Sequence, residues 1–581
     1  MKINFLSMTF PPVLFGITFD YWTIIHPLVQ CFLRSIVLFA YLVTYPVIKM
    51  RLKKRQYCPP VTNDILFWSA TQIADKIRTK QISSEEVVLA FIARCKEVNP
   101  ILNAIVENNF EKAITQARIV DQFLKNTTIS EMNLEQDMPL LGVPVTVKAS
   151  IAVKDFCFAV GEVSQKHVKA TNDAPAVANL RRDGAIILLT SNVPEYCMSF
   201  ETMNNITGRT LNPYDTERTP GGSSGGESAL ISSAASVIGV ASDVGGSARL
   251  PAMFCGIFGH KPSCNWVSSV GHKPVARSKK WESIFTISVM TRYAVDIPLI
   301  LKSIATNEEC KEYLNTKVDI NKMNVYYITD EYSSILCLPI DEEIKVAIRN
   351  VAEHLNSTFG CPIKQLKLQN MKYVIEIVAA MVFKVADVET IFNIGDGSKP
   401  WKSVFIVLLK RLFRLNLHTW PCIIYGFFLK SLQLVPSWYH KAVTKKRDIL
   451  KKELEEILGS NSVLILPTFN SCAHYHSEIY AKVLNIGYMA IFNELGFPVT
   501  QCPVGLNKKG LPIGLQLVAN DKCDNLTITL AKEIEKKFGG WQLPPSNIKK
   551  NNGTELDNGY THSNSEITKK MIEISLTNNI K

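Results

Sequence analysis

The sequence predicts an α/β protein, in which a β-sheet carries helices on its faces. The segment from Asp173 to Thr190 shows the unit: Asp173-Ala174-Pro175 is typical of a helix start, Gly184 of a helix end, and residues 185–190 form a β-run. Strand-like and helix-like segments alternate in this way along the chain, which favours a sheet covered by helices. The 581 residues, 47% of them hydrophobic, are sufficient for a large buried core and exclude wholesale disorder.

Composition and charge indicate how the chain is divided into domains and which class of partner it binds. No Pro/Ser-rich linker divides the middle of the chain, so we expect one large domain at 58–545, preceded by a separate segment at 1–57 and followed by a polar, disordered tail at 546–581. The net charge is +12, but the basic residues lie near hydrophobic segments without interleaved aromatic residues. This pattern favours anionic lipid, and not nucleic acid, as the partner. The 14 cysteines form no C-x-x-C pairs, so we predict reduced thiols and no metal site.

Residues 22–48 are predicted to anchor the protein in a membrane. The segment is apolar apart from His26 and Arg34 and is longer than the roughly 20 residues that cross a bilayer. Arg34 divides it into two shorter halves, so a spanning helix and a hairpin both remain open. A cleaved signal peptide is disfavoured because the apolar region is too long. By the positive-inside rule, the basic residues that follow place the rest of the chain in the cytosol; they are Lys49, Arg51, Lys53, Lys54 and Arg55.

The segment 140–148 is predicted to be a buried strand that ends at its one charged residue, Lys148. The neighbours of Lys148 are apolar or hydroxylated, so we expect its amine to be buried. Burial lowers the pKa of an amine. A lysine that is neutral in the resting state can take a proton as a general base.

The stretch 221–252 contains small residues at a density that ordinary helices and strands do not need. Two Gly-Gly pairs run directly into serines, Ser223 and Ser247, and the residues between them predict a helix at 227–235 and a strand at 237–241. Consecutive N–H groups in the second turn can form a nest for negative charge, which is an oxyanion hole beside a hydroxyl. A phosphate-binding loop is disfavoured because the lysine of G-x-x-x-x-G-K-[ST] is absent.

These motifs resemble the amidase signature of the serine amidohydrolases and, within that family, the fatty-acid amide hydrolases, especially their membrane-anchored second form. The likeness runs from about 64 to 541 and includes the spacing between Ser223 and Ser247 and the strand ending at Lys148. It implies a large mixed β-sheet with helices on both faces. It also implies a proton relay in which Lys148 draws a proton from Ser223 and Ser223 draws one from Ser247. Ser247 then attacks the amide carbonyl, and water hydrolyses the acyl-enzyme.

The resemblance assigns further roles around the relay. The N–H groups of Val244, Gly245, Gly246 and Ser247 would hold the oxyanion, Ser224 would hydrogen-bond within the relay, and the peptide bond before Ser223 would be cis. Asp243 and Arg249 lie on either side of the nucleophile, and we expect an ion pair that braces the oxyanion turn; a surface pair is the alternative. His260 is expected to be structural. The chemistry needs no metal and no organic cofactor.

The segment 401–438 combines apolar and basic residues. Its apolar residues recur at helical spacing, and both an internal core helix and an amphipathic helix at a membrane surface fit this pattern. The fatty-acid amide hydrolases carry a membrane-facing cap in the comparable region, so the resemblance favours a cap. The apolar set is Phe405, Leu408, Leu409, Leu412, Phe413, Ile423, Ile424, Phe427, Phe428 and Leu432, and the basic set is Lys402, Lys410, Arg411, Arg414 and Lys430.

The sequence therefore predicts a membrane-bound serine amidase that hydrolyses fatty-acid amides to the acid and an amine. Its expected partners are a small-molecule lipid amide and membrane lipid, with no nucleic acid, and a homodimer remains open. We expect a cytosolic domain at the surface of the endoplasmic reticulum or of lipid droplets. Two rivals remain: an amidotransferase A subunit, against which the anchor argues, and a non-catalytic lipid-binding or scaffold protein, against which the intact Lys148, Ser223 and Ser247 argue.

Overall fold

A large mixed β-sheet forms the centre of the protein. The structure is a computed structural model and describes residues 13–14, 17–18, 26–276, 280–329, 334–384, 388–392, 403–413, 415–432 and 434–546. Within them, eleven strands pair in the order β12-β11-β13-β15-β14-β9-β10-β8-β4-β5-β3. They are β3 Ile105–Asn108, β4 Pro144–Lys148, β5 Ile186–Ser191, β8 Ile238–Asp243, β9 Phe258–Lys261, β10 Thr286–Thr291, β11 Asn324–Tyr327, β12 Ile363–Gln365, β13 Ser462–Pro467, β14 Val499–Leu506 and β15 Pro512–Val518.

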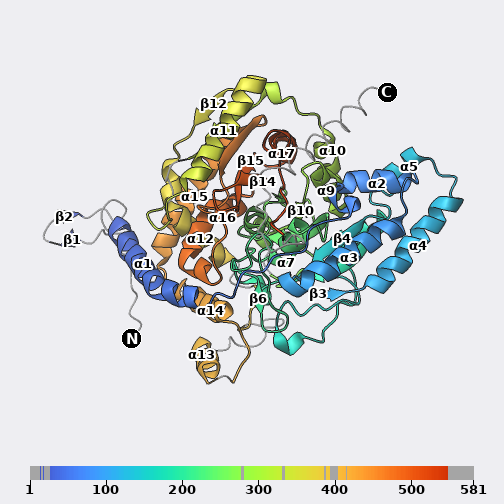
Figure 1. Cartoon of the computed structure of the whole chain (residues 1–581). Coiled ribbons are helices and arrows are strands. Elements are labelled where there is room, and N and C mark those ends of the chain that lie inside the picture. Colours follow the sequence, from blue (N-terminus) through green and yellow to red (C-terminus); the bar gives the residue numbers. More distant parts are fainter. Residues whose placement is uncertain are drawn as a thin grey trace, which may run out of the picture.

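Helices flank this sheet on both faces (Figure 1), which confirms the predicted fold class. β4 runs parallel to β5 and β8, whereas β8 and β10 are antiparallel, so the sheet is mixed. The helices are α1 His26–Met50, α2 Ala70–Arg78, α3 Ser84–Leu102, α4 Phe110–Asn126, α5 Glu131–Asp137, α6 Pro175–Arg182, α7 Gly225–Ser232, α8 Arg249–Phe254, α9 Asp296–Ile304, α10 Glu309–Asn315, α11 Glu342–Phe359, α12 Val374–Lys384, α13 Val404–Leu412, α14 Trp420–Leu432, α15 Ser437–Leu458, α16 Gly487–Leu495 and α17 Asp524–Phe538.

The predicted elements around the glycine turns are present, with shifted ends. α7 begins two residues before the predicted helix, and β8 continues to Asp243, beyond the predicted strand end. The strand predicted at 140–148 is shorter, because residues 140–143 form turns in which Gly142 has a positive φ of 76°. Glycine adopts this conformation without strain. The strand nevertheless ends at Lys148, as predicted.

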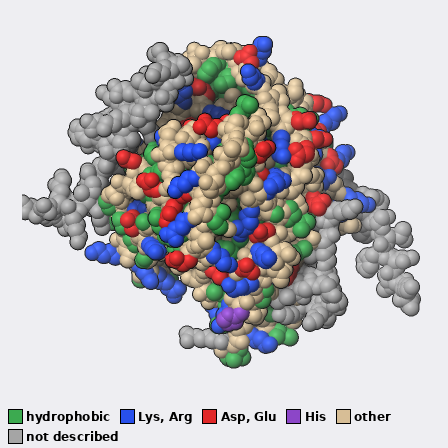
Figure 2. Space-filling view, turned by 90° about the vertical axis from the view of Figure 1, so that its right-hand side faces the viewer, with side chains coloured by type: hydrophobic (Ala, Val, Ile, Leu, Met, Phe, Trp, Pro, Cys, Tyr) green, Lys and Arg blue, Asp and Glu red, His purple; other side chains and the backbone are tan. Residues whose placement is uncertain are grey.

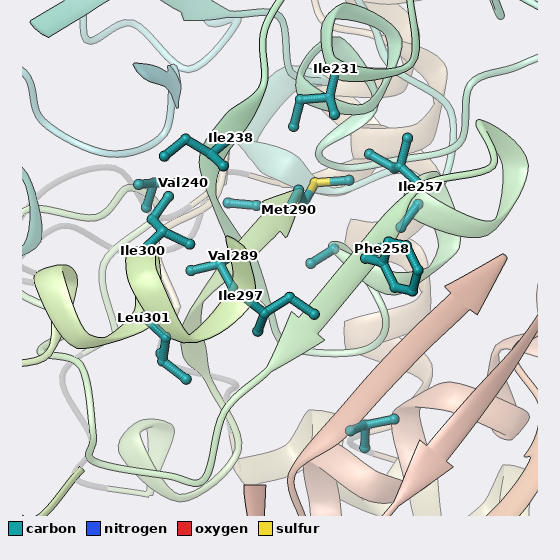
Figure 3. Packing of buried hydrophobic residues seen from close by; sticks show 14 of the residues in the cluster. Ile231, Ile238, Val240, Ile257, Phe258, Val289, Met290, Ile297, Ile300 and Leu301 are labelled. Atoms are coloured by element: carbon teal, nitrogen blue, oxygen red, sulfur yellow. The ribbon is translucent and has the colours of Figure 1, made fainter. Parts of the chain in front are cut away.

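The strands that end at the glycine turns are fixed by a fully buried core. Figure 3 shows β8, β9, β10 and α9 packing through branched and aromatic side chains. Each such side chain contributes about 1.5–3 kcal/mol when it is fully buried. This packing fixes β8, and β4 pairs with β8 along its edge. The packed side chains, all completely buried, are Ile238, Val240, Phe258, Val289, Met290, Ile297, Ile300 and Leu301.

α1 is long and apolar enough to span a membrane. It passes through Arg34 without a break and has Pro46 in its interior. A hairpin broken at Arg34 is therefore not formed. The polar tail predicted at 546–581 lies outside the described residues except for Ser546.

α13 and α14 form an appendage with its own small core. Val404, Val407, Cys422 and Ile423 are buried together with residues of other segments, so Ile423 is core. The outer face stays open: Phe405, Leu409 and Leu412 of α13 and Ile424 and Phe428 of α14 are 69%, 53%, 59%, 58% and 40% exposed. The inner face is therefore core, as the first alternative predicted, and the exposed apolar outer face leaves the membrane-facing cap a prediction. Of the predicted set, Lys402, Arg414 and the side chain of Leu432 lie outside the described residues.

Charges of both signs cover the face of the molecule at the right of Figure 1. Figure 2 shows this face, on which lysine and arginine side chains are interspersed with aspartate and glutamate side chains. The positive net charge therefore does not gather there into a single basic stripe.

Candidate active site

Lys148 lies at the end of β4 and is completely buried. Its Nζ donates hydrogen bonds to Ser223 Oγ at 2.8 Å and to Ser242 Oγ at 2.9 Å. Burial lowers the pKa of Lys148, and this effect outweighs the opposing influence of nearby acidic groups. The amine is therefore shifted toward the neutral form that can accept a proton.

The first glycine turn places Ser223 directly against Lys148. The peptide bond between Gly222 and Ser223 is cis, as expected. A Cβ on Gly222 would lie 2.6 Å from the carbonyl oxygen of Ser199, so the close approach of the two chains requires glycine. Ser224 differs from the expectation: its buried hydroxyl makes no hydrogen bond within the described residues. The second hydroxyl bound by Lys148 is that of Ser242.

A main-chain hydrogen bond joins the two serine turns. The Ser224 N–H donates to the Ser247 carbonyl oxygen at 3.1 Å. Among the described residues, the hydroxyls of Ser223 and Ser247 make no hydrogen bond to each other, so the structure brings the turns together without closing the second link of the expected relay. Ser247 itself is 7% exposed.

The second glycine turn presents N–H groups, but not all that the sequence predicted. The Gly246 N–H donates to Asp243 Oδ1 at 2.8 Å and is therefore occupied. The N–H groups of Val244, Gly245 and Ser247 have no acceptor among the described residues. Gly246 has φ of 107°, and a Cβ there would lie 2.6 Å from the sulfur of Met489, so only glycine fits.

Asp243 and Arg249 form a buried ion pair at 3.1 Å, with both side chains 0% exposed, so the surface alternative is wrong. Asp243 also accepts hydrogen bonds from the N–H groups of Gly246 and Ala248. Burial alone raises the pKa of Asp243, but the Arg249 guanidinium and these hydrogen bonds outweigh it and hold the pKa below its usual value. The pair fixes the turn that carries Ser247.

The chain resembles known proteins over most of its length. The family model described as "Amidase" matches residues 86–528. The chain belongs to the amidase family. It is 38% identical over 490 residues to "Fatty-acid amide hydrolase 2" of Homo sapiens, covering 84% of this chain and 92% of that protein. It is equally 38% identical over 492 residues to "Fatty-acid amide hydrolase 2-A" of Danio rerio, covering 84% and 91%. The solved structure "Fatty acid amide hydrolase" has TM-score 0.63 and 23% identity, covering 82% of this chain and 86% of that one.

This amidase has polar residues beside Lys148 that the sequence did not reveal. Ser242 Oγ lies 3.0 Å from His272 Nε2, and His272 Nδ1 lies 3.3 Å from the Pro274 carbonyl oxygen. Burial, followed by the proximity of Lys148, lowers the pKa of His272 to about 3, so the ring is neutral near pH 7. Ser242 could have been suspected from its place next to Asp243 at a strand end. Nothing in the sequence places His272 there.

Glu227 is a second residue that the sequence did not single out. It lies on α7, is fully buried, and accepts a hydrogen bond from Ser191 Oγ at 2.6 Å and another from Thr146 Oγ1. Burial raises the pKa of Glu227 to about 7. Its carboxyl group joins α7 to β4 and β5 directly behind Lys148.

Two further groups of residues have structural roles. His260 is completely buried between Thr500 and Asp524, at 2.9 and 3.1 Å, as a structural histidine would be. Glu162, Glu195 and His418 have ligand atoms within 4.8 Å of one another and could hold a metal ion. His418 Nδ1 already lies 2.8 Å from Glu195 Oε1. This contact connects the appendage of α13 and α14 to the loop after β5.

Proposed function

We propose that this amidase is membrane-bound and hydrolyses fatty-acid amides to a free fatty acid and an amine. The observation that carries the proposal is the buried hydrogen bond from Lys148 Nζ to Ser223 Oγ at 2.8 Å, next to the turn that holds Ser247. Serine hydroxyls attack amides only when a base takes their proton. The two fatty-acid amide hydrolase relatives at 38% identity support the substrate class.

The reaction would proceed through an acyl-enzyme. Neutral Lys148 takes the proton of Ser223, Ser223 takes the proton of Ser247, and Ser247 Oγ bonds to the amide carbonyl carbon. The N–H groups of Val244, Gly245 and Ser247 stabilise the oxyanion, because they have no other acceptor among the described residues. The relay then returns the proton to the leaving nitrogen as the C–N bond breaks. Water hydrolyses the resulting ester by the same steps.

Two apolar surfaces support a location at a membrane. α1 and the outer face of α13 and α14 would bind membrane lipid and let long acyl amides enter without crossing water. The domain at 58–545 would then be the catalytic unit, on the cytosolic face of the endoplasmic reticulum or of lipid droplets. Each CH₂ group buried in the pocket contributes about 0.8 kcal/mol, so acyl length alone can separate good substrates from poor ones.

A labelling and turnover experiment tests the proposal. Wild-type protein in membranes should react with a fluorophosphonate probe and hydrolyse amides of increasing acyl length, with the rate favouring long chains. Ser247→Ala should lose labelling and turnover together. Ser232→Ala is the matched control, since this buried hydroxyl on α7 also lacks a hydrogen bond within the described residues. Equal labelling of wild type and Ser247→Ala would exclude Ser247 as the nucleophile, and hydrolysis of glutamine but of no acyl amide would favour the amidotransferase alternative.

A further inference from the structure

Glu162, Glu195 and His418 form a cluster of metal-ligand side chains outside the candidate active site. Glu162 precedes the turn Val163–Gln165, Glu195 lies in the loop after β5, and His418 lies between α13 and α14. His418 Nδ1 is 2.8 Å from Glu195 Oε1 and 3.5 Å from Glu162 Oε2. Three segments that are distant in the sequence therefore bring one imidazole nitrogen and two carboxylate oxygens together.

Each carboxylate is held through one oxygen and turns the other toward His418. Glu195 Oε2 accepts hydrogen bonds from the Thr419 N–H at 2.6 Å and from Thr419 Oγ1 at 2.7 Å. Glu162 Oε1 accepts from the Ser164 N–H at 3.2 Å and from Ser164 Oγ at 2.8 Å. Carboxylates that bind metals in proteins are oriented by hydrogen bonds of this kind.

The free oxygen of Glu162 is the observation that points to a ligand. Glu162 is 3% exposed, and its Oε2 makes no hydrogen bond within the described residues. The 3.5 Å to His418 Nδ1 is longer than an ordinary N–H···O hydrogen bond. A buried carboxylate oxygen without a partner is costly. A cation placed between Glu162 Oε2 and His418 Nδ1 would remove this cost.

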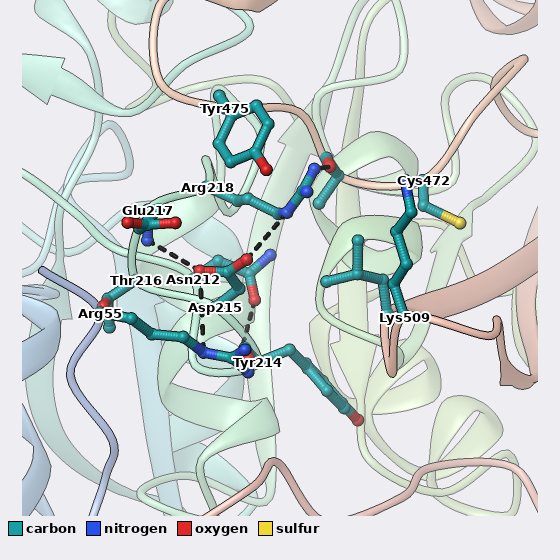
Figure 4. A network of polar contacts seen from close by, with 12 residues as sticks. Arg55, Asn212, Tyr214, Asp215, Thr216, Glu217, Arg218, Cys472, Tyr475 and Lys509 are labelled. Atoms are coloured by element: carbon teal, nitrogen blue, oxygen red, sulfur yellow. Dashed lines mark hydrogen bonds and ion pairs between the residues drawn. The ribbon is translucent and has the colours of Figure 1, made fainter. Parts of the chain in front are cut away.

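Other buried carboxylates of this protein are paired with arginine. Figure 4 shows Asp215 between Arg218, at 2.9 Å, and Arg55, at 3.8 Å. Glu162 and Glu195 differ, because among the described residues neither lysine nor arginine lies within ion-pair distance of them.

The charge of the cluster therefore needs a cation of another kind. Two ionised carboxylates carry a charge of −2, and a proton on His418 would leave a buried charge of −1. A divalent cation bound by the neutral imidazole would leave none. Buried charge is costly unless it is compensated, so the cluster favours a divalent cation over a proton.

The donor set indicates a zinc-like ion. Zinc binds imidazole nitrogen and carboxylate oxygen, whereas calcium and magnesium prefer oxygen alone. Two ligands at zinc bond lengths of about 2.1 Å lie about 3.4 Å apart in a tetrahedron, which matches the distance from His418 to Glu162. His418 would have to move about 0.6 Å from Glu195 to reach this spacing, and its side chain, 17% exposed, is at the edge of the cluster.

We propose that Glu162, Glu195 and His418 bind a divalent transition-metal ion of the zinc class, which fastens the appendage of α13 and α14 to the loop after β5. The same loop carries Ser199, whose carbonyl oxygen lies against Gly222 of the first glycine turn. The ion is thus a structural clamp between the appendage and the surroundings of the active site. It takes no part in the proposed relay, and the inference does not rest on the catalytic proposal.

A zinc titration of the full-length protein in detergent tests the site. After removal of metal with a chelator, the wild type should bind Zn²⁺ in competition with a chromophoric chelator. Glu162→Gln and His418→Gln should each weaken this binding at least about 100-fold, since even outer-shell partners of a metal contribute 10- to 100-fold. Glu353→Gln, an exposed change of the same kind on α11, should leave it unchanged.

The 14 cysteines of the chain require a control for thiol binding. Cys422 is the nearby thiol, and it donates to the Glu195 carbonyl oxygen at 3.2 Å, so Cys422→Ser should keep the zinc. Co²⁺ bound at the site should show its visible absorption without a sulfur-to-cobalt charge-transfer band. Zinc binding that survives both Glu162→Gln and His418→Gln would overturn the proposal. Absence of zinc binding in the wild type would also overturn it and would mean that His418 carries a proton between the carboxylates.

Stability and hydrogen exchange test the clamp without an activity assay. Zinc should raise the Tm of the wild type, because an ion that binds only the folded state stabilises it, and it should slow amide exchange in α14. Glu162→Gln, whose side chain has nearly the same shape, should show neither response. Zinc that binds to the wild type but leaves the exchange of α14 unchanged would refute the clamp.

Discussion

Removal of the Ser242 hydroxyl should slow the amidase and shift its pH profile, although Ser242 makes no bond to the substrate. Neutral His272 faces the Pro274 carbonyl oxygen with Nδ1, and a carbonyl can only accept, so we assign the ring proton to Nδ1. Nε2 then accepts from the Ser242 hydroxyl, whose oxygen accepts from Lys148. One N–H of the neutral amine is thus fixed, and its lone pair can point at Ser223.

The magnitude follows from the one buried hydrogen bond that Ser242→Ala removes from Lys148. Such a loss costs about 1–3 kcal/mol. If this loss raises the free energy of the transition state by the same amount, kcat/KM drops roughly 5- to 150-fold, since each 1.36 kcal/mol changes a rate tenfold. The hydroxyl also stabilises the ammonium form, so its removal lowers the pKa of Lys148 further. Because the rate rises with pH as Lys148 loses its proton, the rising limb should move to lower pH.

The assay is kcat/KM against pH with a short, soluble amide, together with the rate of fluorophosphonate labelling. Ser242→Thr keeps a hydroxyl and should retain most of the activity and the position of the limb, and Ser232→Ala should leave both unchanged. His272, with its pKa of about 3, does not titrate in the range of the assay. The reasoning would be refuted if Ser242→Ala had the kcat/KM of the wild type and the rising part of its pH profile lay at the same pH.

The other predictions concern the base, the turn and the appendage. Lys148→Ala should lose most activity and the rising limb of the pH profile, and a variant that kept the wild-type profile would identify another base. Asp243→Asn should leave Arg249 buried without its counter-charge and lower the free energy of unfolding by about 3–5 kcal/mol, measured by urea denaturation against an exposed Asp→Asn control. Leu412→Asp with Phe428→Asp should reduce kcat/KM for long acyl amides far more than for short ones, and an equal loss for both would show that this exposed apolar face does not help long acyl chains to enter.

The sequence predicted those parts of the site that a single local stretch determines. Gly246 needs a positive φ and has no room for a side chain, and a buried strand that ends in a lone lysine indicates an amine removed from water. The sequence could not show which N–H groups are available for an oxyanion, because Gly246 donates to Asp243 only in the folded turn. The sequence also could not predict the position of His272 or the carboxylates beside His418. These contacts join distant segments and depend on how the whole sheet packs.

The end of β8 shows how one strand can serve both the chemistry and its support. Successive side chains of a strand point to opposite faces, so Ser242 faces Lys148 while Asp243 faces Arg249. Burial acts on the two sites with opposite results. Asp243 keeps its charge because Arg249 and two N–H groups compensate the loss of water, and the charge holds the turn rigid. Lys148 meets hydroxyl groups and no carboxylate within hydrogen-bond distance among the described residues, so burial shifts it toward the neutral amine that the proposed relay requires.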